Sequence, residues 1–563
     1  MRGGIVLHGV AGAVTAVVLA PLALPGYVLR YDMTFVPRQP LNWEMIAPAG
    51  ALPRAVPMDA VVSVANLAVP GWLLQRIALV AIVYLAALGA ARLLPTDRLS
   101  PRVVAALAYA WTPLLAERLL IGQWALLLAY ACLPWLVIAV GDLRESRPGA
   151  LPRLLLAAAP AALTPTGGLL ALVTVAVLLP ARNFSRRVTA LTLAAVTVLN
   201  APWLVAALGS AAGGTSDPEG VAQFAARAEN WAGAWVALAG TGGIWNAQTV
   251  PASRESVLAP LVTLLVLAVA VAGLPVLRRR IPESAGRLFV LAVGGFLLAA
   301  AGTGPGAVLL EWMVVHVPGA GLLRDGQKFL IPYALVLALG FALGAERAAG
   351  WTARRLDRSA GRVLLAGAAL LPVILLPDLA FGAMGQLRPV RYPADWDVVA
   401  ARVAETPGEV LSLPFEGYQR YAWANNVVIR DPSPRYLDAP VIMNDALRVG
   451  AVTVDGENPR AAAAGALLAA GRPAAEVGSR WVLVRRGSGE PAANVLAGLR
   501  LIYDGEDLQL WENPVAPAVS PAAGDNRRAL ALGAHISAAL IVFGAVVALL
   551  LLGSRSWYRP RTH

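Results

Sequence analysis

Long runs of apolar residues, separated by short polar segments, make up most of this chain. A helix needs roughly 20 apolar residues to cross the hydrocarbon core of a bilayer. By that measure the sequence predicts about twelve membrane-spanning helices, of which Val103 to Leu115 and the two beside Thr164 are short enough to be re-entrant or tilted. The predicted spans are Gly3 to Gly26, Leu73 to Leu94, Val103 to Leu115, Gln123 to Val140, Leu151 to Leu163, Gly168 to Leu179, Val188 to Leu208, Val257 to Leu277, Leu288 to Ala301, Phe329 to Ala345, Val363 to Ala380 and Ala529 to Leu552.

Arginine residues are concentrated in alternate loops between these spans. Short cytoplasmic loops of membrane proteins carry the excess of basic residues, so we expect both termini to lie in the cytoplasm. Of the 46 basic residues all but Lys328 are arginine, which is typical of a GC-rich bacterial genome, and we expect a multi-pass protein of the bacterial inner membrane. The arginine-rich positions are Arg92, Arg98 and Arg102; Arg144, Arg147 and Arg153; Arg182, Arg186 and Arg187; Arg278, Arg279, Arg280 and Arg287; Arg347, Arg354, Arg355, Arg358 and Arg362; and Arg555, Arg559 and Arg561 in the tail.

The same alternation of inner and outer loops places the long loops on the outer side of the membrane. These long loops are rich in tryptophan and acidic residues. These loops cover residues 27–72, 209–256 and 302–328. Residues 1–383 are then expected to form one transmembrane domain. Because the polar, chemically varied loops share one side, we expect the active face to be extracytoplasmic.

The pattern changes between residues 384 and 528, where short helix-like and strand-like segments replace the long apolar runs. A segment of about 140 residues is long enough to bury its own core. We expect a small extracytoplasmic α/β domain here, followed in 529–563 by a final span and a basic cytoplasmic tail. Its predicted elements are a helix over Asp395 to Glu405, buried strands over 408–414 and 480–484, an Ala-rich helix over Pro459 to Ala470, and a hairpin over Leu499 to Trp511 that turns at Asp504-Gly505.

The composition excludes an ordinary soluble protein. Of the 563 residues, 58% are hydrophobic and only 14% are charged, and the mean hydropathy is +0.64. The net charge of +12 comes from arginine clusters between apolar runs, where membrane orientation and anionic lipid head groups account for it. No helix-turn-helix, zinc knuckle or RNP motif occurs, so membrane lipids are expected partners and nucleic acid is not.

Several motif classes are missing from the sequence. The four histidines are too far apart for metal-ligand spacing, no Walker loop or nucleophile elbow occurs, and the single cysteine, Cys132, rules out an internal disulfide. No row of intramembrane acids or broken-helix inverted repeat marks an ion-coupled transporter. Candidate chemistry is therefore expected in the outer loops.

Asp32 lies directly after the first span, within Arg30 to Arg38. We expect that span to be a retained helix and not a cleaved signal peptide, because Leu24-Pro25-Gly26-Tyr27 is a poor cleavage site. A carboxylate at the lipid-water boundary lies where a lipid-borne substrate presents its head group. Asp32 is therefore the leading candidate for a catalytic base, and an acid that is simply solvated outside a helix is the alternative.

Two further groups of polar residues lie on the expected outer side. Asp59 stands at the start of a short interfacial helix over Met58 to Leu74, either as a helix cap or as a functional acid. Glu117 and Arg118, followed by Gln123, occupy the next outer turn. A Glu-Arg pair at the membrane edge forms either a mutual ion pair or part of a site.

A third group directly precedes a predicted span, in Gly319 to Lys328. Its two cations are Arg324 and Lys328, with Asp325 and Gln327 between them and glycines around them. A guanidinium can bind two phosphate oxygens and an ammonium acts as a point charge. The group suits a phosphate, and the alternative is a head-group anchor for the next helix.

The loop over 209–256 places tryptophans, among them Trp245, beside amide and charged side chains. Such a group can stack on the apolar face of a sugar ring, but a belt of interfacial tryptophans is the more common explanation. The possible acceptor-binding or supporting residues are Asp59, Glu117, Arg118, Gln123, Trp245, His316 and Asp325.

This layout resembles the GT-C superfamily of membrane glycosyltransferases, which use polyprenyl-phosphate-linked sugars on the outer face of the membrane. The likeness lies in an acid soon after the first span, Asp32, a long first outer loop, eleven or more spans and a late outer domain. Arg324 to Lys328 before a span, together with Glu117-Arg118 and Gly122-Gln123-Trp124, looks most like the membrane part of bacterial arabinofuranosyltransferases that extend cell-wall arabinan.

The resemblance implies an inverting transfer of a sugar, arabinofuranose or mannose, from a polyprenyl phosphate to a cell-envelope glycan or glycolipid. Asp32 would deprotonate the acceptor hydroxyl. Arg324, Lys328 and Gln327 would hold the donor phosphate. The metal-dependent members carry an Asp-x-Asp pair after the first span, whereas this chain has Thr34, so a divalent cation such as Mg²⁺ or Mn²⁺ is not indicated and no other cofactor is expected.

Two other classes of function stay open at this point. A lipid or polysaccharide transporter or flippase would need polar residues through both leaflets, whereas here they gather on one side. A non-catalytic envelope assembly protein would recruit partners through the outer domain, and would not need Asp32 or Lys328.

Overall fold

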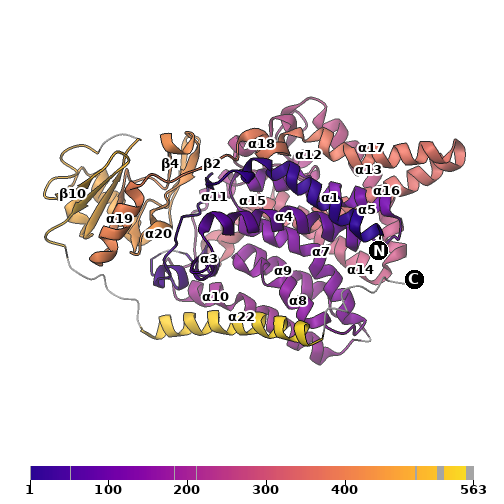
Figure 1. The fold of residues 1–563 in the computed structure, drawn as a ribbon, viewed down its shortest axis with the longest axis horizontal. Helices are drawn as coiled ribbons and strands as arrows, with labels where there is room; N and C mark the ends of the chain where they lie inside the picture. Colours follow the sequence, from indigo (N-terminus) through magenta and orange to yellow (C-terminus); the bar gives the residue numbers. More distant parts are fainter. Residues whose placement is uncertain are drawn as a thin grey trace.

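The computed structural model describes residues 2–50, 52–182, 184–210, 212–487, 491–516 and 525–552. The predicted basic tail with Arg555, Arg559 and Arg561 lies outside the described residues. A bundle of long helices and a smaller, sheet-containing part at one end of it make up the molecule (Figure 1). This arrangement confirms the expected fold class of a helical membrane protein with a small α/β part near its C-terminus.

Ten helices among the described residues are long and apolar enough to cross a membrane. They coincide with ten of the twelve predicted spans. The other two predictions fall on shorter apolar segments, Ala150–Leu163 and Pro165–Leu178, which pack against the fourth of the long helices. The ten are Gly3–Ala23 (α1 and η1), Gly71–Leu93 (α4), Leu99–Leu120 (α5 and α6), Trp124–Arg144 (α7), Arg186–Leu208 (α10), Ala259–Arg280 (α13), Pro282–Ala301 (α14), Gly326–Arg355 (η6 and α16), Arg358–Leu375 (α17) and Asn526–Leu551 (in α22).

The helix α16 (Ile331–Arg355) is largely buried in the bundle. Glycines on both α16 and α13 let the two helices approach very closely. A Cβ at Gly344 of α16 would lie 1.9 Å from the carbonyl oxygen of Val269, and a Cβ at Gly273 of α13 would lie 1.9 Å from the carbonyl oxygen of Gly340. Small residues at helix contacts are typical of membrane bundles, where close packing holds the helices together. This contact fixes the position of the segment that precedes α16 and carries Lys328.

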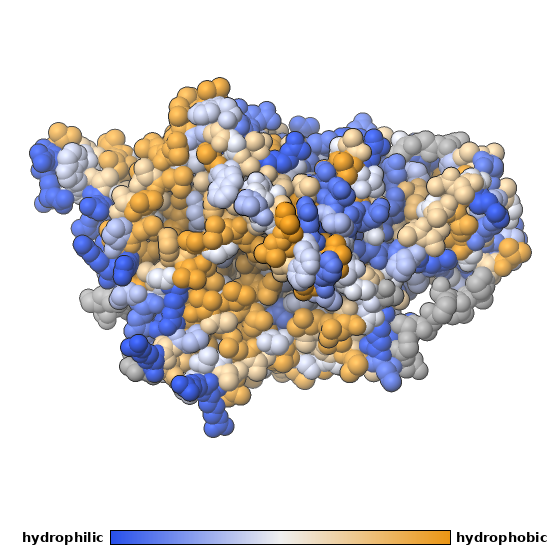
Figure 2. Space-filling model, turned by 180° about the vertical axis from the view of Figure 1, so that it is seen from behind, coloured by the Kyte–Doolittle hydropathy of each residue, from blue (hydrophilic) through white to orange (hydrophobic). Residues whose placement is uncertain are grey.

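An apolar belt covers the helices between two more polar ends (Figure 2). The end with the β-strands is called the sheet end below. The opposite end, where α4, α7, α13 and α16 finish in Arg92, Arg144, Arg280 and Arg354, is called the arginine end. Polar ends on either side of an apolar belt are what a protein that spans a bilayer requires.

The small part at the sheet end contains a five-stranded sheet with the strand order β10-β11-β9-β3-β6. Within it β3 (Val410–Leu413) runs parallel to β6 (Val441–Ile442) and to β9 (Trp481–Arg485). The hairpin of β10 (Arg500–Asp504) and β11 (Leu508–Glu512) continues the sheet in antiparallel fashion. Every residue of β3 and β9 is buried, and this agrees with the predominance of apolar residues in both strands.

Two helices pack on this sheet from opposite faces. The helix α19 (Asp395–Glu405) contributes Trp396 and Val399 to one apolar cluster, and α21 (Pro459–Ala469) contributes Ala461 to the other. The two predicted helices, the two predicted buried strands and the predicted hairpin are therefore present. The short pairs β1–β2, β4–β5 and β7–β8, by contrast, were not predicted.

One of these short pairs connects the small part to the helical bundle. The strand β5 (Val428–Arg430) pairs with β4 (Tyr418–Arg420), and its other edge receives the turn that follows the first helix. The amide of Tyr31 donates to the Val428 carbonyl at 2.7 Å, and the amide of Arg430 donates back to the Tyr31 carbonyl at 3.0 Å. Residues almost 400 positions apart in the sequence therefore meet beside Asp32.

Candidate active site

Asp32 occupies a tight turn at the sheet end. Tyr31, which precedes it, has a positive φ of 43°, a conformation that a non-glycine residue adopts only when its surroundings hold it. The amide of Asp32 donates to the Ile121 carbonyl at 3.1 Å. At Gly122 a Cβ would lie only 2.2 Å from the amide nitrogen of Met33. The turn is therefore clamped between β5 and the connection from α6 (Pro113–Leu120) to α7.

Two side chains hold the carboxylate of Asp32. The Tyr418 hydroxyl donates to Oδ1 at 2.6 Å, and Nε2 of Gln123 donates to Oδ2 at 3.5 Å. Burial and the negative charge of Asp32 raise the pKa of Tyr418 well above its ordinary value. Tyr418 therefore remains a protonated donor. Asp32 itself is only half-buried, so part of the residue faces solvent.

A continuous chain of polar contacts leads from Asp32 to Lys328. The side-chain oxygen Oε1 of Gln123 accepts from Nη1 of Arg118 at 2.8 Å. Arg118 also donates from both terminal nitrogens to the two oxygens of Asp325, at 2.7 Å each. Nζ of Lys328 lies 3.2 Å from Oδ2 of Asp325. The structure thus brings five of the predicted site residues together at one end of the bundle.

The ion pair between Arg118 and Asp325 is the buried centre of this chain. The Arg118 side chain is fully buried. Burial alone would raise the pKa of Asp325, but Arg118 and Lys328 hold it well below its usual range, so the carboxylate is ionised. Lys328 is less enclosed, with 23% of its side chain exposed. Because an ammonium has three N–H donors, Lys328 can bind a further anion.

Glu117 and Gln327 form a second buried group next to the chain. Nε2 of Gln327 donates to Oε2 of Glu117 at 2.6 Å and to the Gly242 carbonyl at 3.1 Å. The amide of Ile244 donates to the same Glu117 oxygen at 3.2 Å. Glu117 and the adjacent Arg118 therefore have different partners and do not form the mutual ion pair considered from the sequence. Because the side-chain nitrogen of Gln327 is used in these contacts, Gln327 holds the segment that carries Lys328 in position.

Arg324 points to a different part of the sheet end. Its Nη2 lies 3.2 Å from Oε1 of Glu457, and its guanidinium carbon lies 5.2 Å from the centre of the Phe224 ring. Glu457 also binds Arg54 and accepts from Ser216 at 2.6 Å. Burial, followed by repulsion from Arg54, lowers the pKa of Arg324. Its Nη1 has no hydrogen-bond partner among the described residues, so a role in phosphate binding stays a prediction.

Three other predicted residues lie outside the chain of contacts. Asp59 pairs with Nε of Arg435 at 3.1 Å; it lies in the first turn of α3 (Met58–Asn66) and is not its cap, since Pro57 holds that position. Trp245 packs edge-on against Phe224, with ring centres 4.9 Å apart. His316 is exposed on α15 (Gly306–His316) and stacks on Trp312.

Sequence patterns did not indicate three residues that surround Asp32 from the small part: Tyr418, Arg430 and Arg435. Arg435 donates to the Thr34 carbonyl at 2.9 Å. Burial opposes the charge of Arg430, but Tyr418 and Asp32 are among the groups that raise its pKa. The three residues lie in or next to a short hairpin without alternating apolar positions, and only the long-range pairing with Tyr31 brings them to the site.

Comparisons with known proteins show the family and the fold of this chain. The sequence profile of the family described as alpha-(1->3)-arabinofuranosyltransferase, N-terminal GT-C domain, matches residues 33–447. A search of the curated proteins finds no match. Two cryo-EM structures of arabinofuranosyltransferase AftD from mycobacteria, one of them a mutant, are similar in fold, each with 16% identity and a TM-score of 0.53.

These similarities cover 92% of this chain but only 40% and 42% of the two solved chains. The chain thus spans about two fifths of the length of the structures it matches, and at this level of identity the match concerns the fold. The family profile, in contrast, covers well over half of the sequence, including Arg118, Gln123, Lys328 and Tyr418. The chain therefore belongs to the family of the N-terminal GT-C domain of alpha-(1->3)-arabinofuranosyltransferases.

Proposed function

We propose that this chain transfers a sugar, arabinofuranose in the first place, from a polyprenyl-phosphate donor to a cell-envelope glycan or glycolipid. The sheet end would face away from the cytoplasm of a bacterial inner membrane, in agreement with the arginines at the opposite end. The observation that supports this proposal is the chain of contacts whose two ends are Asp32, the proposed base, and Lys328, the proposed phosphate ligand.

In the proposed reaction Asp32 accepts the proton of an acceptor hydroxyl while the hydroxyl oxygen attacks the anomeric carbon of the donor sugar. The bond between that carbon and the phosphate oxygen breaks, and its electron pair leaves with the polyprenyl phosphate. Attack from the side opposite to the leaving group inverts the configuration. Lys328 would stabilise the charge that develops on the departing phosphate, and Tyr418 and Gln123 would keep the carboxylate oriented.

The two other predicted phosphate ligands take lesser roles in this proposal. Gln327 is buried with its amide engaged, so it would position the Lys328 segment instead of contacting the donor. Arg324 is paired with Glu457 and would reach the donor only through its remaining nitrogen. Among the described residues no group of three or more His, Cys, Asp and Glu could hold a metal ion, and the proposed step includes none.

The proposal is tested by incubating purified protein with radiolabelled polyprenyl-phosphate sugars and extracted envelope glycolipids. Asp32→Asn keeps the size of the side chain and an acceptor for Tyr418, so the variant should fold and lose transfer. Asp59→Asn, which removes an acid of the same loop that is already paired with Arg435, is the matched control and should retain transfer. Undiminished turnover of Asp32→Asn would refute the role of Asp32.

A further inference from the structure

A second possible binding site lies at the arginine end, remote from Asp32. It is a cavity of about 1470 Å³ between the ends of α4, α5, α7, α13, α14 and α16. On α16, Glu346 and Arg354 line this cavity, and they lie roughly 22 and 35 Å along the helix from its start near Lys328, at 1.5 Å per residue. The cavity therefore does not belong to the candidate active site.

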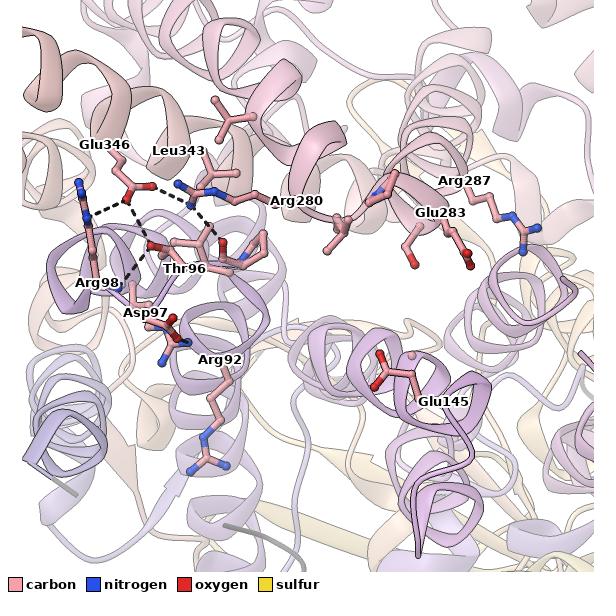
Figure 3. Close-up of a pocket in the computed structure, with 18 of the residues that line it drawn as sticks. Arg92, Thr96, Asp97, Arg98, Glu145, Arg280, Glu283, Arg287, Leu343 and Glu346 are labelled. Carbon is pink, nitrogen blue, oxygen red and sulfur yellow. Dashed lines mark hydrogen bonds and ion pairs between the residues drawn. The ribbon is translucent and has the colours of Figure 1, made fainter. Parts of the chain in front are cut away.

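Positive charge dominates the wall of this cavity. Nine arginines and four carboxylates line it, which leaves an excess of five positive charges. Figure 3 shows one carboxylate, Glu346, between Arg98 and Arg280, whose guanidinium groups lie 3.7 and 2.9 Å from its oxygens. The nine are Arg92, Arg98, Arg102, Arg144, Arg182, Arg280, Arg287, Arg347 and Arg354.

Several of these arginines are held in place by backbone carbonyls or by neighbouring side chains. Arg280 donates to the Pro95 carbonyl at 3.0 Å, and Arg287 donates to the Leu178 carbonyl at the end of α9 (Pro165–Leu178) at 3.0 Å. Arg92 donates to His8 at 3.0 Å and lies over the ring of Trp135. Arginines that only set the orientation of the protein in the membrane need to lie in the cytoplasmic loops, and their exact positions do not matter. Such a role does not require arginines from six helices to converge on one cavity.

The chemistry of the wall selects the ligand. Guanidinium groups bind phosphate oxygens in pairs, and a cavity larger than the roughly 300 to 1,000 Å³ of ordinary ligand pockets has room for more than one phosphate. Apolar residues, among them Leu94, Phe184 and Ile281, line the same cavity. Basic cavities between transmembrane helices on the cytoplasmic side typically bind anionic lipid head groups.

We propose that the arginine end binds a ligand with two or more phosphate groups, and that the head group of a diphosphate phospholipid is its natural source. The side chains of Arg182, Arg347 and Arg354 are exposed at the cavity and would contact the phosphates directly. This inference does not depend on the proposed sugar transfer, because it concerns the opposite end of the bundle and none of the residues assigned to the reaction.

Native mass spectrometry of the full chain in detergent tests the proposal with three added lipids of equal acyl chains: cardiolipin, phosphatidylglycerol and phosphatidylethanolamine. We expect tightest binding of cardiolipin. The triple variant Arg182→Gln, Arg347→Gln, Arg354→Gln should weaken it about tenfold or more. The matched control replaces three exposed arginines of the same end that do not line the cavity, Arg355, Arg358 and Arg362, by glutamine.

The outcomes separate the possible explanations. Equal losses in the two triple variants, or equal binding of all three lipids, would overturn the proposal, because either result describes a general basic surface. Inorganic tripolyphosphate is the soluble probe. Suppose that the cavity triple variant weakens the binding of tripolyphosphate, and that cardiolipin does not bind at the cavity. The phosphate site is then supported, and its natural ligand is a soluble molecule and not a lipid. Gel filtration and thermal unfolding of both variants check that each remains folded.

Discussion

The two ends of the bundle use charge in different ways. At the sheet end Arg118, Asp325 and Lys328 are joined by direct contacts, and Arg118 is fully buried. At the arginine end nine arginines surround an open cavity with only four carboxylates. A buried, paired network fixes the geometry of particular side chains, whereas an excess of one charge around a cavity attracts a ligand of the opposite charge. The first arrangement suits catalysis and the second suits binding.

The largest expected effect on sugar transfer comes from replacing Asp32, the last residue of the chain of contacts. Asp32→Asn should lower sugar transfer by about 10²- to 10⁴-fold, the usual contribution of a general base. The radiolabel transfer assay measures this. Unfolding temperature should stay near that of the natural protein, since asparagine can still accept from Tyr418. A variant with normal transfer would show that the sheet end is not organised around Asp32.

Breaking the buried ion pair should cost stability as well as activity. Arg118→Ala leaves Asp325 charged and without its main partner, which typically costs about 3–5 kcal/mol. Thermal unfolding in detergent gives the size of the loss. The double variant Arg118→Met, Asp325→Leu should recover much of that stability and still fail in transfer, because Gln123 then lacks its contact with Arg118 and Lys328 lacks its contact with Asp325. Recovery of both stability and transfer would contradict a functional network.

Replacing the lysine should affect the donor more than the acceptor. Lys328→Gln should raise the KM for the polyprenyl-phosphate sugar about tenfold to hundredfold, the equivalent of one charge-assisted hydrogen bond, with little change in the KM for the acceptor. Arg324→Gln should have the smaller effect, since Arg324 is paired with Glu457. A larger rise in the donor KM for Arg324→Gln than for Lys328→Gln would show that Arg324, and not Lys328, is the main phosphate ligand.

Removing one donor to the base should lower the rate of transfer. The Tyr418 hydroxyl donates to Oδ1 of Asp32 at 2.6 Å, and Tyr418 stays protonated because burial and Asp32 raise its pKa. Tyr418→Phe removes this donor and should lower kcat about tenfold, the equivalent of one hydrogen bond to a charged group. The radiolabel assay measures this. Unchanged transfer would show that Tyr418 does not orient the base.

The smallest expected effect tests whether the two ends are independent. The triple variant of Arg182, Arg347 and Arg354 that weakens lipid binding should leave sugar transfer in lipid-free detergent unchanged, because these side chains lie at the far end of α16 or beyond it. The radiolabel assay is the measurement. Loss of transfer without loss of folding would show that the arginine end couples to the reaction.

Hydropathy and periodicity were sufficient for much of this architecture. The long spans follow from apolar length, and the sheet of the small part follows from the buried runs at β3 and β9. Proximity within the site was harder to predict. Asp32, Arg118 and Lys328 could be assigned to one membrane side by counting spans, but their contacts depend on Gln123 and Asp325. Those contacts are set by helix packing that no local pattern describes.

Other features could not be read from the sequence because they arise from distant segments. Tyr418 reaches Asp32 only because β5 pairs with the turn at Tyr31. Arg324 appeared equivalent to Lys328 from its position, whereas the fold directs it to Glu457, more than 130 residues later. Nine of the arginines that the sequence assigned to one side line a single cavity, and this convergence depends on where the helices end.

A cryo-EM structure of the Asp32→Asn variant with a bound polyprenyl-phosphate arabinofuranose would test the central claim most directly. We predict that the phosphate lies within hydrogen-bonding distance of Nζ of Lys328, and that the anomeric carbon faces the side chain at position 32. A donor bound with its phosphate away from Lys328, or with packed helices between its sugar and position 32, would contradict the proposed site.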